Sequence, residues 1–212
     1  AFGEIIHANI APQYIQAIMA SCRPQQDFKV VIDCANSIVG PLAVSLFNQL
    51  GYEVIPLFCQ PDGNFPNHDP NPSDEGNLQT LQAAVLSNQA DLGLAFDGDG
   101  DRLVVISGSG EILWPDQLLM IFARDILTRY PKTDIVFDVK SSFSLKQLVS
   151  ELGGNPVMCK TGHSHVRSKV QQTGALVGGE FSGHIFFNDR WHGFDDGLYA
   201  SVRLLEILAN CD

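Results

Sequence analysis

The sequence predicts an α/β protein made of two consecutive three-layer α/β/α domains with mixed, parallel-biased sheets. Short apolar runs bounded by polar residues alternate with longer amphipathic stretches, and this alternation occurs twice along the chain. The 212 residues, 45% of them apolar, suffice for two packed cores. Consecutive strand–helix–strand units place helices on both faces of a largely parallel sheet, which gives the three layers.

The first predicted domain covers residues 1–111. Its first apolar run, FKVVID, is typical of a buried parallel strand, and Gly51 suits the end of the following helix. Residues 59–77 hold four prolines and form a long loop. The expected elements are strand 28–33, helix 38–50, strand 53–57, helix 78–88, strands 91–96 and 102–107, and a hairpin at the end.

The second predicted domain covers residues 112–212. It opens with a helix in which Pro115 suits the first turn and Leu118, Phe122 and Ile126 share one face. The elements expected after it are strand 135–139, helix 142–152, strand 155–159, helix 163–172, strand 175–179, a hairpin at 184–188 and helix 195–210.

The charge balance narrows the class of partner. The chain has 24 acidic and 13 basic residues, a net charge of −11, so its field repels nucleic acid and anionic membranes. No apolar run approaches the roughly 18 residues of a membrane span. The five cysteines include no C-x-x-C pair and are expected as reduced thiols, which favours a cytoplasmic protein.

The most informative motif is DGDGDR at residues 97–102, after an apolar strand. Asp97, Asp99 and Asp101 would project to one side of extended backbone and call for a hard cation such as Mg²⁺. The plain alternative is a solvated acidic turn. An EF-hand is excluded because its sixth and twelfth positions would be Arg102 and Gly108. A haloacid-dehalogenase-type phosphatase also uses D-x-D, but it carries Thr or Val where this chain has Asp101.

Three further segments carry polar groups suited to a sugar phosphate. Glu180, Ser182 and His184 alternate in GGEFSGH, where a carboxylate and a hydroxyl can hold vicinal sugar hydroxyls. Basic groups surround a glycine in KTGHSHVR, residues 160–167, near a predicted helix start. Lys140 closes a strand at the edge where α/β domains place ligands. Each segment alone is equally compatible with a polar hairpin tip or a solvated basic face.

Together these segments resemble the α-D-phosphohexomutase family, most closely its bacterial phosphomannomutase/phosphoglucomutase members. The matching stretches run in order over nearly the whole chain: VIDCANSIVG, GNFPNHDPNP, AFDGDGDRLVVIS, DVKSS, KTGHSHV, GGEFSGHIFF and GFDDGLYASVRLLEIL. The resemblance implies that the two predicted domains are the second and third domains of such an enzyme.

The resemblance also implies residue roles. Asp97, Asp99 and Asp101 would bind Mg²⁺, and Arg102 would contact the transferring phosphoryl group. Lys140 and His163 would line the substrate cleft. Glu180 and Ser182 would hold sugar hydroxyls, with His184 beside them. The implied reaction is an isomerase reaction that converts a hexose 1-phosphate to the 6-phosphate through a phosphoserine and glucose 1,6-bisphosphate or its mannose counterpart.

The chain departs from the family pattern in ways that shape the expected activity. The family's serine loop, T-A-S-H-N-P, is absent, so the N-terminal serine domain of a parent enzyme is expected to be missing. Nothing follows Asp212 where the family's fourth domain would begin, so the C-terminal domain is expected to be missing too. The chain alone is therefore expected to be inactive. Phe181 replaces the usual Met, whereas phosphoglucosamine mutases carry Gln. An apolar residue favours mannose and glucose phosphates, with glucosamine phosphate as the alternative. A non-catalytic sugar-phosphate-binding module is the competing class.

Overall fold

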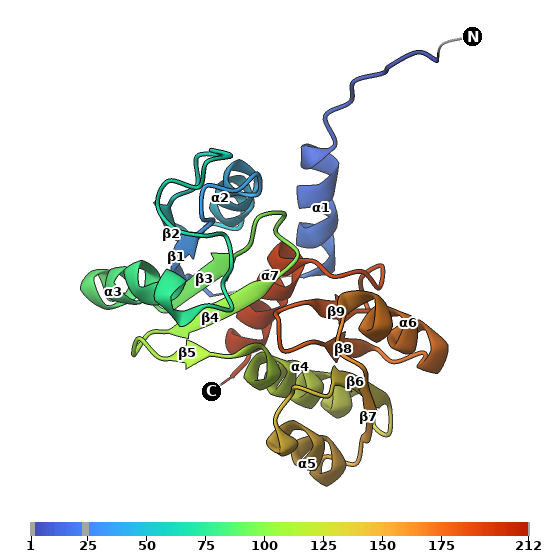
Figure 1. Cartoon of the computed structure of the whole chain (residues 1–212). Coiled ribbons are helices and arrows are strands. Elements are labelled where there is room, and N and C mark those ends of the chain that lie inside the picture. The colour runs from blue at the N-terminus through green and yellow to red at the C-terminus, as the bar shows by residue number, and fades with distance from the viewer. Residues whose placement is uncertain (1–2, 23–25, 212) are drawn as a thin grey trace.

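Two β-sheets with the same order of strands organise the molecule (Figure 1). The computed structural model describes residues 3–22 and 26–211, so residues 1 and 212, at the ends of the predicted domains, lie outside the described residues. In each sheet the first strand lies between two parallel neighbours, and an antiparallel strand follows. The predicted fold class, two α/β/α domains with mixed sheets, is confirmed.

The first sheet has five strands in the order β2-β1-β3-β4-β5. The strands are β1 (Lys29–Asp33), β2 (Glu53–Leu57), β3 (Leu92–Phe96), β4 (Leu103–Ser107) and β5 (Ile112–Leu113). Alternate side chains of β1 enter different clusters: Val30 and Ile32 pack toward α2 (Gly40–Gln49), and Val31 packs toward α3 (Gln79–Asn88). A 3₁₀ helix, η1 (Glu75–Leu78), precedes α3.

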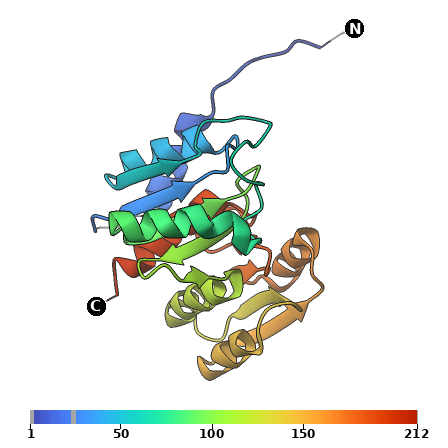
Figure 2. The same ribbon diagram turned by 60° about the vertical axis from the view of Figure 1, so that its left-hand side comes forward.

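The second sheet has four strands in the order β7-β6-β8-β9. They are β6 (Asp134–Asp138), β7 (Asn155–Cys159), β8 (Val177–Gly179) and β9 (Ile185–Phe187). Helices α4 (Pro115–Arg129) and α5 (Phe143–Glu151) cover one face, and α6 (His163–Thr173) covers the other, as Figure 2 shows from a second side. Val136 of β6 packs with the α6 residues Val166 and Val170.

The last helix, α7 (Gly197–Leu208), belongs to both units. It contacts β4 of the first sheet and β9 of the second, and its residues Tyr199, Leu204 and Leu205 are buried in a core that runs through both units. β5 pairs with β4, so the first sheet extends just past residue 111. The division of the chain at 111/112 stays a prediction.

Helix α1 (Ala11–Ser21) was not anticipated from the sequence. Its buried residues Ile15 and Ile18 enter the shared core, and its Tyr14 hydroxyl donates to Asp196 at 2.7 Å. The Tyr14 ring also packs edge-on against Trp191, and the Ser21 hydroxyl lies 3.2 Å from the Tyr199 hydroxyl of α7, so these partners lie far along the chain. A helix held by such distant partners shows only a weak local pattern in the sequence.

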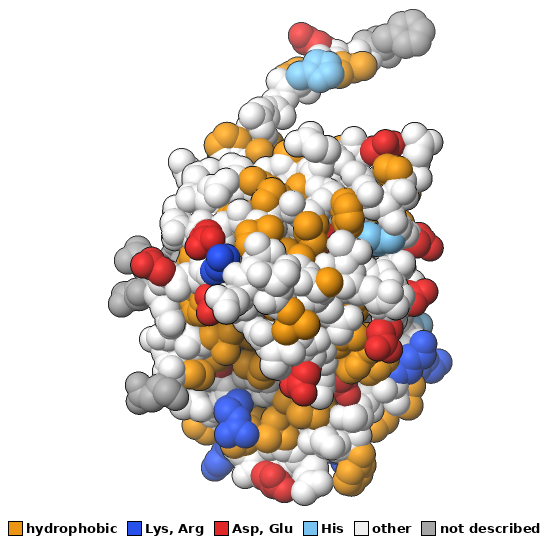
Figure 3. Space-filling view, turned by 90° about the vertical axis from the view of Figure 1, so that its left-hand side faces the viewer, with side chains coloured by type: hydrophobic (Ala, Val, Ile, Leu, Met, Phe, Trp, Pro, Cys, Tyr) orange, Lys and Arg blue, Asp and Glu red, His pale blue; other side chains and the backbone are white. Residues whose placement is uncertain are grey.

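The surface agrees with the acidic composition. On the face that Figure 3 shows, hydrophobic side chains are scattered among polar ones, and Lys and Arg form only small separate groups. Among the described helices, none combines the length and the apolar character that crossing a membrane requires.

Candidate functional site

The two signature loops occupy equivalent places in the two sheets and meet. Residues 97–102 connect β3 to its antiparallel neighbour β4, and residues 180–184 connect β8 to β9. The backbones of Arg102 and His184 form an isolated antiparallel bridge, and the Leu103 N–H donates to the Gly183 carbonyl at 3.1 Å. Backbone pairing therefore joins the aspartate loop of the first unit to the Glu–Ser–His loop of the second.

The aspartate loop is a tight turn, so the prediction of extended backbone is wrong. Gly100 has a φ of 81°, and Oδ1 of Asp97 accepts hydrogen bonds from the N–H groups of Gly100 (3.0 Å) and Arg102 (3.1 Å). The turn still brings the predicted ligands together. One carboxylate oxygen from each of Asp97, Asp99 and Asp101 lies within 4.8 Å of the others.

Arg102 is held in place from two sides. Its Nε donates to Oδ2 of Asp97 at 2.6 Å, and its Nη1 donates to Oδ1 of Asn71 at 3.1 Å. Burial raises the pKa of Asp97, and the guanidinium of Arg102 opposes that shift. The arginine thus offsets part of the negative charge of the loop while its orientation is fixed.

The aspartate loop fits a hard divalent cation. All three donors are carboxylate oxygens, the ligands that Mg²⁺ prefers. A second group that could hold a metal comprises Asp101, His184 and Asp195. Burial lowers the pKa of His184, but the carboxylates of Asp101 and Glu180 outweigh burial and raise it to about 9. The aspartate loop offers three carboxylate oxygens and the second group only two with an imidazole, so a hard cation favours the aspartate loop.

His184 contacts the other polar residues of the Glu–Ser–His loop and also the aspartate loop. Its Nδ1 is 2.9 Å from the Ser182 hydroxyl and 3.5 Å from Oε2 of Glu180, and its Nε2 is 3.3 Å from Oδ1 of Asp101. Among the described residues, neither of these two carboxylate oxygens makes a hydrogen bond although both are buried. The imidazolium therefore compensates a local excess of negative charge at the junction of the two loops.

The other oxygen of Glu180 is anchored by α6. Oε1 accepts from the Gly162 N–H at 3.0 Å, immediately before the helix begins. Burial raises the pKa of Glu180, but His184 and the Gly162 N–H outweigh it and hold the pKa below its usual range. Glu180 is thus a carboxylate at neutral pH, able to accept hydrogen bonds from hydroxyl groups.

The remaining predicted residues differ in how closely they join this site. The His163 ring lies 5.5 Å from the His184 ring, centroid to centroid. Lys140 is exposed at the end of β6. Within the described ranges, no hydrogen bond or ion pair joins Lys140 to the other predicted residues. The structure therefore brings eight of the nine predicted residues together around the two loops: Asp97, Asp99, Asp101, Arg102, His163, Glu180, Ser182 and His184.

Three residues of the site were missed in the sequence. Asn71 holds Arg102, and the Ser73 hydroxyl donates to the Ser182 carbonyl at 3.2 Å, so the proline-rich loop also contacts both signature loops. Asp195 lies 3.9 Å from His184, and burial raises its pKa. Asn71 lies in the motif GNFPNHDPNP, Ser73 directly follows it, and Asp195 lies in GFDDG, but neither motif shows by itself which side chain points to the site.

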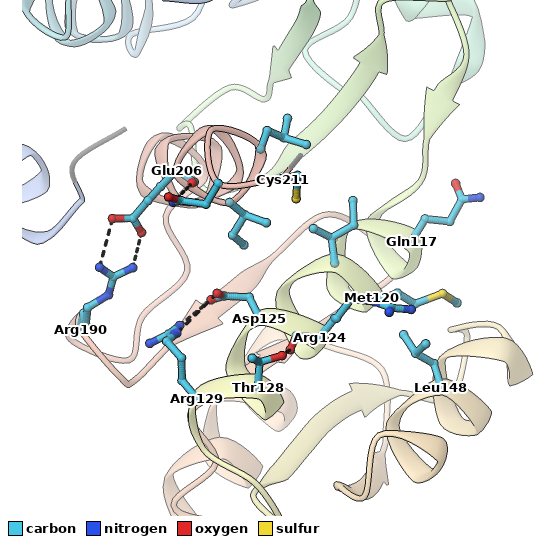
Figure 4. Close-up of a pocket in the computed structure, with 14 residues that line it drawn as sticks. Gln117, Met120, Arg124, Asp125, Thr128, Arg129, Leu148, Arg190, Glu206 and Cys211 are labelled. Atoms are coloured by element: carbon cyan, nitrogen blue, oxygen red, sulfur yellow. Dashed lines mark hydrogen bonds and ion pairs between the residues drawn. The ribbon is translucent and has the colours of Figure 1, made fainter. Parts of the chain in front are cut away.

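Of two cavities in the molecule, only the smaller borders the aspartate loop. One of about 520 Å³ borders the aspartate loop and is lined by Tyr14, Val39, Asp99, Asp101 and Asp195, among others. A larger one, of about 810 Å³, lies between α4 and the end of α7 (Figure 4). Of its three arginines, Arg129 is paired with Asp125 and Arg190 with Glu206, and no predicted site residue lines it. The chemistry points to the smaller cavity.

Comparison with known proteins places both units in one family. Residues 12–110 match the family model of phosphoglucomutase/phosphomannomutase α/β/α domain II, and residues 114–212 match that of domain III. A phosphomannomutase/phosphoglucomutase from Pseudomonas aeruginosa is 51% identical over 207 residues, which is 98% of this chain and 45% of that protein.

Solved structures agree. A phosphoglucomutase/phosphomannomutase family protein from Burkholderia thailandensis superposes with a TM-score of 0.93 at 49% identity, over 96% of this chain and 44% of that one. An N-acetylphosphoglucosamine mutase from Aspergillus fumigatus, solved with GlcNAc-6P and magnesium, shares the fold at 18% identity and a TM-score of 0.67. The chain spans less than half the length of the two bacterial relatives. It belongs to the phosphoglucomutase/phosphomannomutase family of α-D-phosphohexomutases, and the predicted resemblance is confirmed.

Proposed function

We propose that this chain forms the metal-binding and sugar-binding domains of a phosphohexomutase that interconverts the 1-phosphates and 6-phosphates of mannose and glucose. The observation that carries the proposal is the bridge between Arg102 and His184. It fixes a cation-binding loop beside a loop that can hold sugar hydroxyls, as transfer of a phosphoryl group to and from a sugar requires. Residues 1–111 would supply the first loop and residues 112–212 the second.

Asp97, Asp99 and Asp101 would hold the Mg²⁺. When bound, the cation would neutralise charge on the transferring phosphoryl group. Arg102 would contact the same group, and its two fixed hydrogen bonds to Asp97 and Asn71 hold the guanidinium oriented before substrate binds. Electrostatic groups that are already oriented need no reorganisation during the reaction, which is the main contribution a protein makes to phosphoryl transfer.

Glu180 and Ser182 would hold hydroxyls of the sugar ring. Glu180 is a carboxylate in the folded protein and accepts hydrogen bonds, while the Ser182 hydroxyl can donate or accept. Mannose and glucose differ only at C2. Contacts to the hydroxyls at C3 and C4 would therefore serve both sugars in both orientations of the bisphosphorylated intermediate. His163 and Lys140 would add positive charge along the cleft.

The phosphatase alternative has less support. The phosphatase pattern carries Thr or Val where this chain has Asp101. Hexose phosphates and glucose 1,6-bisphosphate are accordingly the proposed ligands. The proposed location is the cytoplasm, where the five cysteines would stay reduced.

The test combines a binding measurement with a domain exchange. In calorimetry with Mg²⁺, mannose 1-phosphate and glucose 1-phosphate are expected to bind this chain, and Glu180→Gln should weaken both similarly. A charge-assisted hydrogen bond is worth about 1.5–3 kcal/mol, a loss of roughly tenfold or more. Glu151→Gln, at the end of α5, is the matched control and should change nothing.

The exchange replaces the corresponding segment of the Pseudomonas aeruginosa relative with this chain. Mutase activity on both sugars is expected. A folded hybrid that binds Mg²⁺ and sugar phosphate but forms no product would refute the proposed reaction. Loss of affinity for only one sugar in Glu180→Gln would show instead that this residue recognises C2.

A further inference from the structure

Two buried cysteines, Cys34 and Cys59, lie in contact just past the ends of neighbouring strands of the first sheet. Cys34 follows β1 and Cys59 follows β2, and these strands are parallel neighbours. The two Sγ atoms are 3.5 Å apart. Twenty-five positions separate the residues in the chain, so their approach is a feature of the fold and not of local sequence.

The two thiols differ in access and in acidity. Cys34 is fully buried, whereas 8% of Cys59 is exposed. When Cys59 is a thiolate, the S–H of Cys34 can donate to it, and this hydrogen bond lowers the pKa of Cys59. The thiolate is the form that reacts with peroxides. The geometry therefore provides two thiols already in contact, with Cys59 the more accessible of the pair.

We propose that Cys34 and Cys59 form a modification site at which a hydroperoxide produces a disulfide bond. The Cys59 thiolate attacks one peroxide oxygen, the O–O bond breaks, and Cys59 becomes a sulfenic acid as hydroxide leaves. The Cys34 sulfur then attacks the Cys59 sulfur, the S–S bond forms, and the sulfenic oxygen leaves as water with the Cys34 proton. The peroxide is reduced and the two thiols are oxidised.

Bond formation requires the sulfur atoms to approach to about 2.05 Å. The backbone of Cys59 lies directly against Gly40, since a Cβ added at Gly40 would lie only 2.2 Å from the Cys59 carbonyl oxygen. A shift of Cys59 therefore also affects Gly40. Gly40 begins α2, and the preceding Val39 packs on the aspartate loop, where a Cβ on Gly100 would lie 2.7 Å from Val39 Cγ2. Close contacts thus run from Cys59 through Gly40 and Val39 to the aspartate loop, and we expect movement of Cys59 toward Cys34 to disturb that loop.

The experiment exposes the reduced chain to hydrogen peroxide, blocks remaining thiols with an alkylating agent, and maps peptides without reductant. Trypsin leaves both cysteines in one peptide, so cleavage after Glu53 is used to separate them. The expected result is loss of two of the five thiols and a cross-linked pair of peptides that carry Cys34 and Cys59. The Mn²⁺ affinity of the oxidised chain, measured by paramagnetic resonance, should fall at least severalfold and recover with reductant.

Cys22 provides the matched control. It is also buried, and burial raises its pKa to about 11, but no hydrogen bond joins it to another thiol in the described part of the chain. Cys22→Ser should keep the cross-link and Cys34→Ser should abolish it. Complete alkylation of Cys34 and Cys59, when the wild-type chain meets peroxide while folded and is then alkylated in denaturant, would overturn the proposal, whether or not the variants fold. Unchanged Mn²⁺ affinity after cross-linking would overturn the link to the aspartate loop.

Discussion

Arg102 and His184, which come from different units of the molecule, pair through their backbones. Between them, Gly183 has a φ of 110°, and a Cβ there would lie 3.1 Å from Cβ of Arg102 and 3.2 Å from the Leu103 carbonyl oxygen. The close approach of the two signature loops therefore depends on the absence of a side chain at Gly183. The relative position of the aspartate loop and the Glu–Ser–His loop is set by backbone contacts and not by flexible side chains.

Gly183→Ala should therefore weaken the site and the fold together. The positive φ costs about 1–3 kcal/mol for a residue with a Cβ, and the contact with Arg102 adds to that cost. Gly51→Ala is the control, because Gly51 also has a positive φ of 85° but no atom within 4 Å of its Cβ position. Urea unfolding should show a larger loss for Gly183→Ala. Only that variant should bind Mn²⁺ and glucose 1-phosphate more weakly, and equal losses in both variants would contradict this account.

The second prediction concerns the metal. Asp99→Asn removes one of three carboxylates that can converge on a cation, and the affinity for Mn²⁺ should fall by roughly tenfold, about 1.4 kcal/mol. Glu111→Gln, in the hairpin between β4 and β5, removes the same charge from an exposed position and is expected to have little effect. Paramagnetic resonance of Mn²⁺ measures both. Unchanged affinity in Asp99→Asn would remove this residue from the ligand set.

The sequence was sufficient to predict the two-domain α/β/α architecture, because buried strands such as 28–33 are continuous apolar runs and their neighbours have helical periodicity. It also identified the residues of the aspartate loop and of the Glu–Ser–His loop, since paired carboxylates and regular spacing signal chemistry locally. Helix α1 was missed because its helix-stabilising contacts, such as Tyr14 with Asp196, lie at the other end of the chain.

The same reason explains what was missed in the site. Asn71 and Ser73 lie in a proline-rich loop whose composition predicts irregular structure, and nothing local shows that their side chains reach Arg102 and Ser182. The bridge between Arg102 and His184 is likewise a long-range contact. Residue types and spacing predict which groups can do chemistry, whereas the packing of the two units determines which of them meet.

The third prediction concerns acid stability. Asp189 is fully buried and forms a bidentate pair with the buried Arg203, at 2.8 and 3.1 Å. Burial raises the pKa of Asp189, but Arg203 outweighs it and holds the pKa below its usual range. This stability is present above the unfolded pKa of about 3.9 and is lost as pH falls through the lower folded pKa.

Asp189→Asn should therefore cost about 3 kcal/mol at pH 7, because it removes the bidentate partner of the buried Arg203 and leaves only the longer ion pairs to Asp125 (3.4 Å) and Glu206 (3.7 Å). The difference between wild type and variant should shrink below about pH 4, because Asp189 of the unfolded chain takes up a proton there while Asp189 of the folded chain is still charged. Urea unfolding at pH 7, 5 and 3 measures it, with exposed Asp62→Asn as the control. A difference that stays constant down to pH 3 would show that the charge of Asp189 does not carry this stability.

The last prediction is that the chain by itself binds sugar phosphates but does not interconvert them. It contains the loops proposed to bind the cation and the sugar, yet no segment of its 212 residues has the T-A-S-H-N-P order of a phosphorylated serine loop. Without a phosphoryl donor, the groups at Asp97, Arg102 and Glu180 can orient a sugar phosphate but have nothing to transfer.

The assay incubates the chain with Mg²⁺, glucose 1-phosphate and a trace of glucose 1,6-bisphosphate, and follows glucose 6-phosphate. The Pseudomonas aeruginosa relative is run in parallel as the positive control. Product formation above background that disappears in Asp97→Ala would contradict the prediction, and it would require a phosphoryl-accepting group within these two domains.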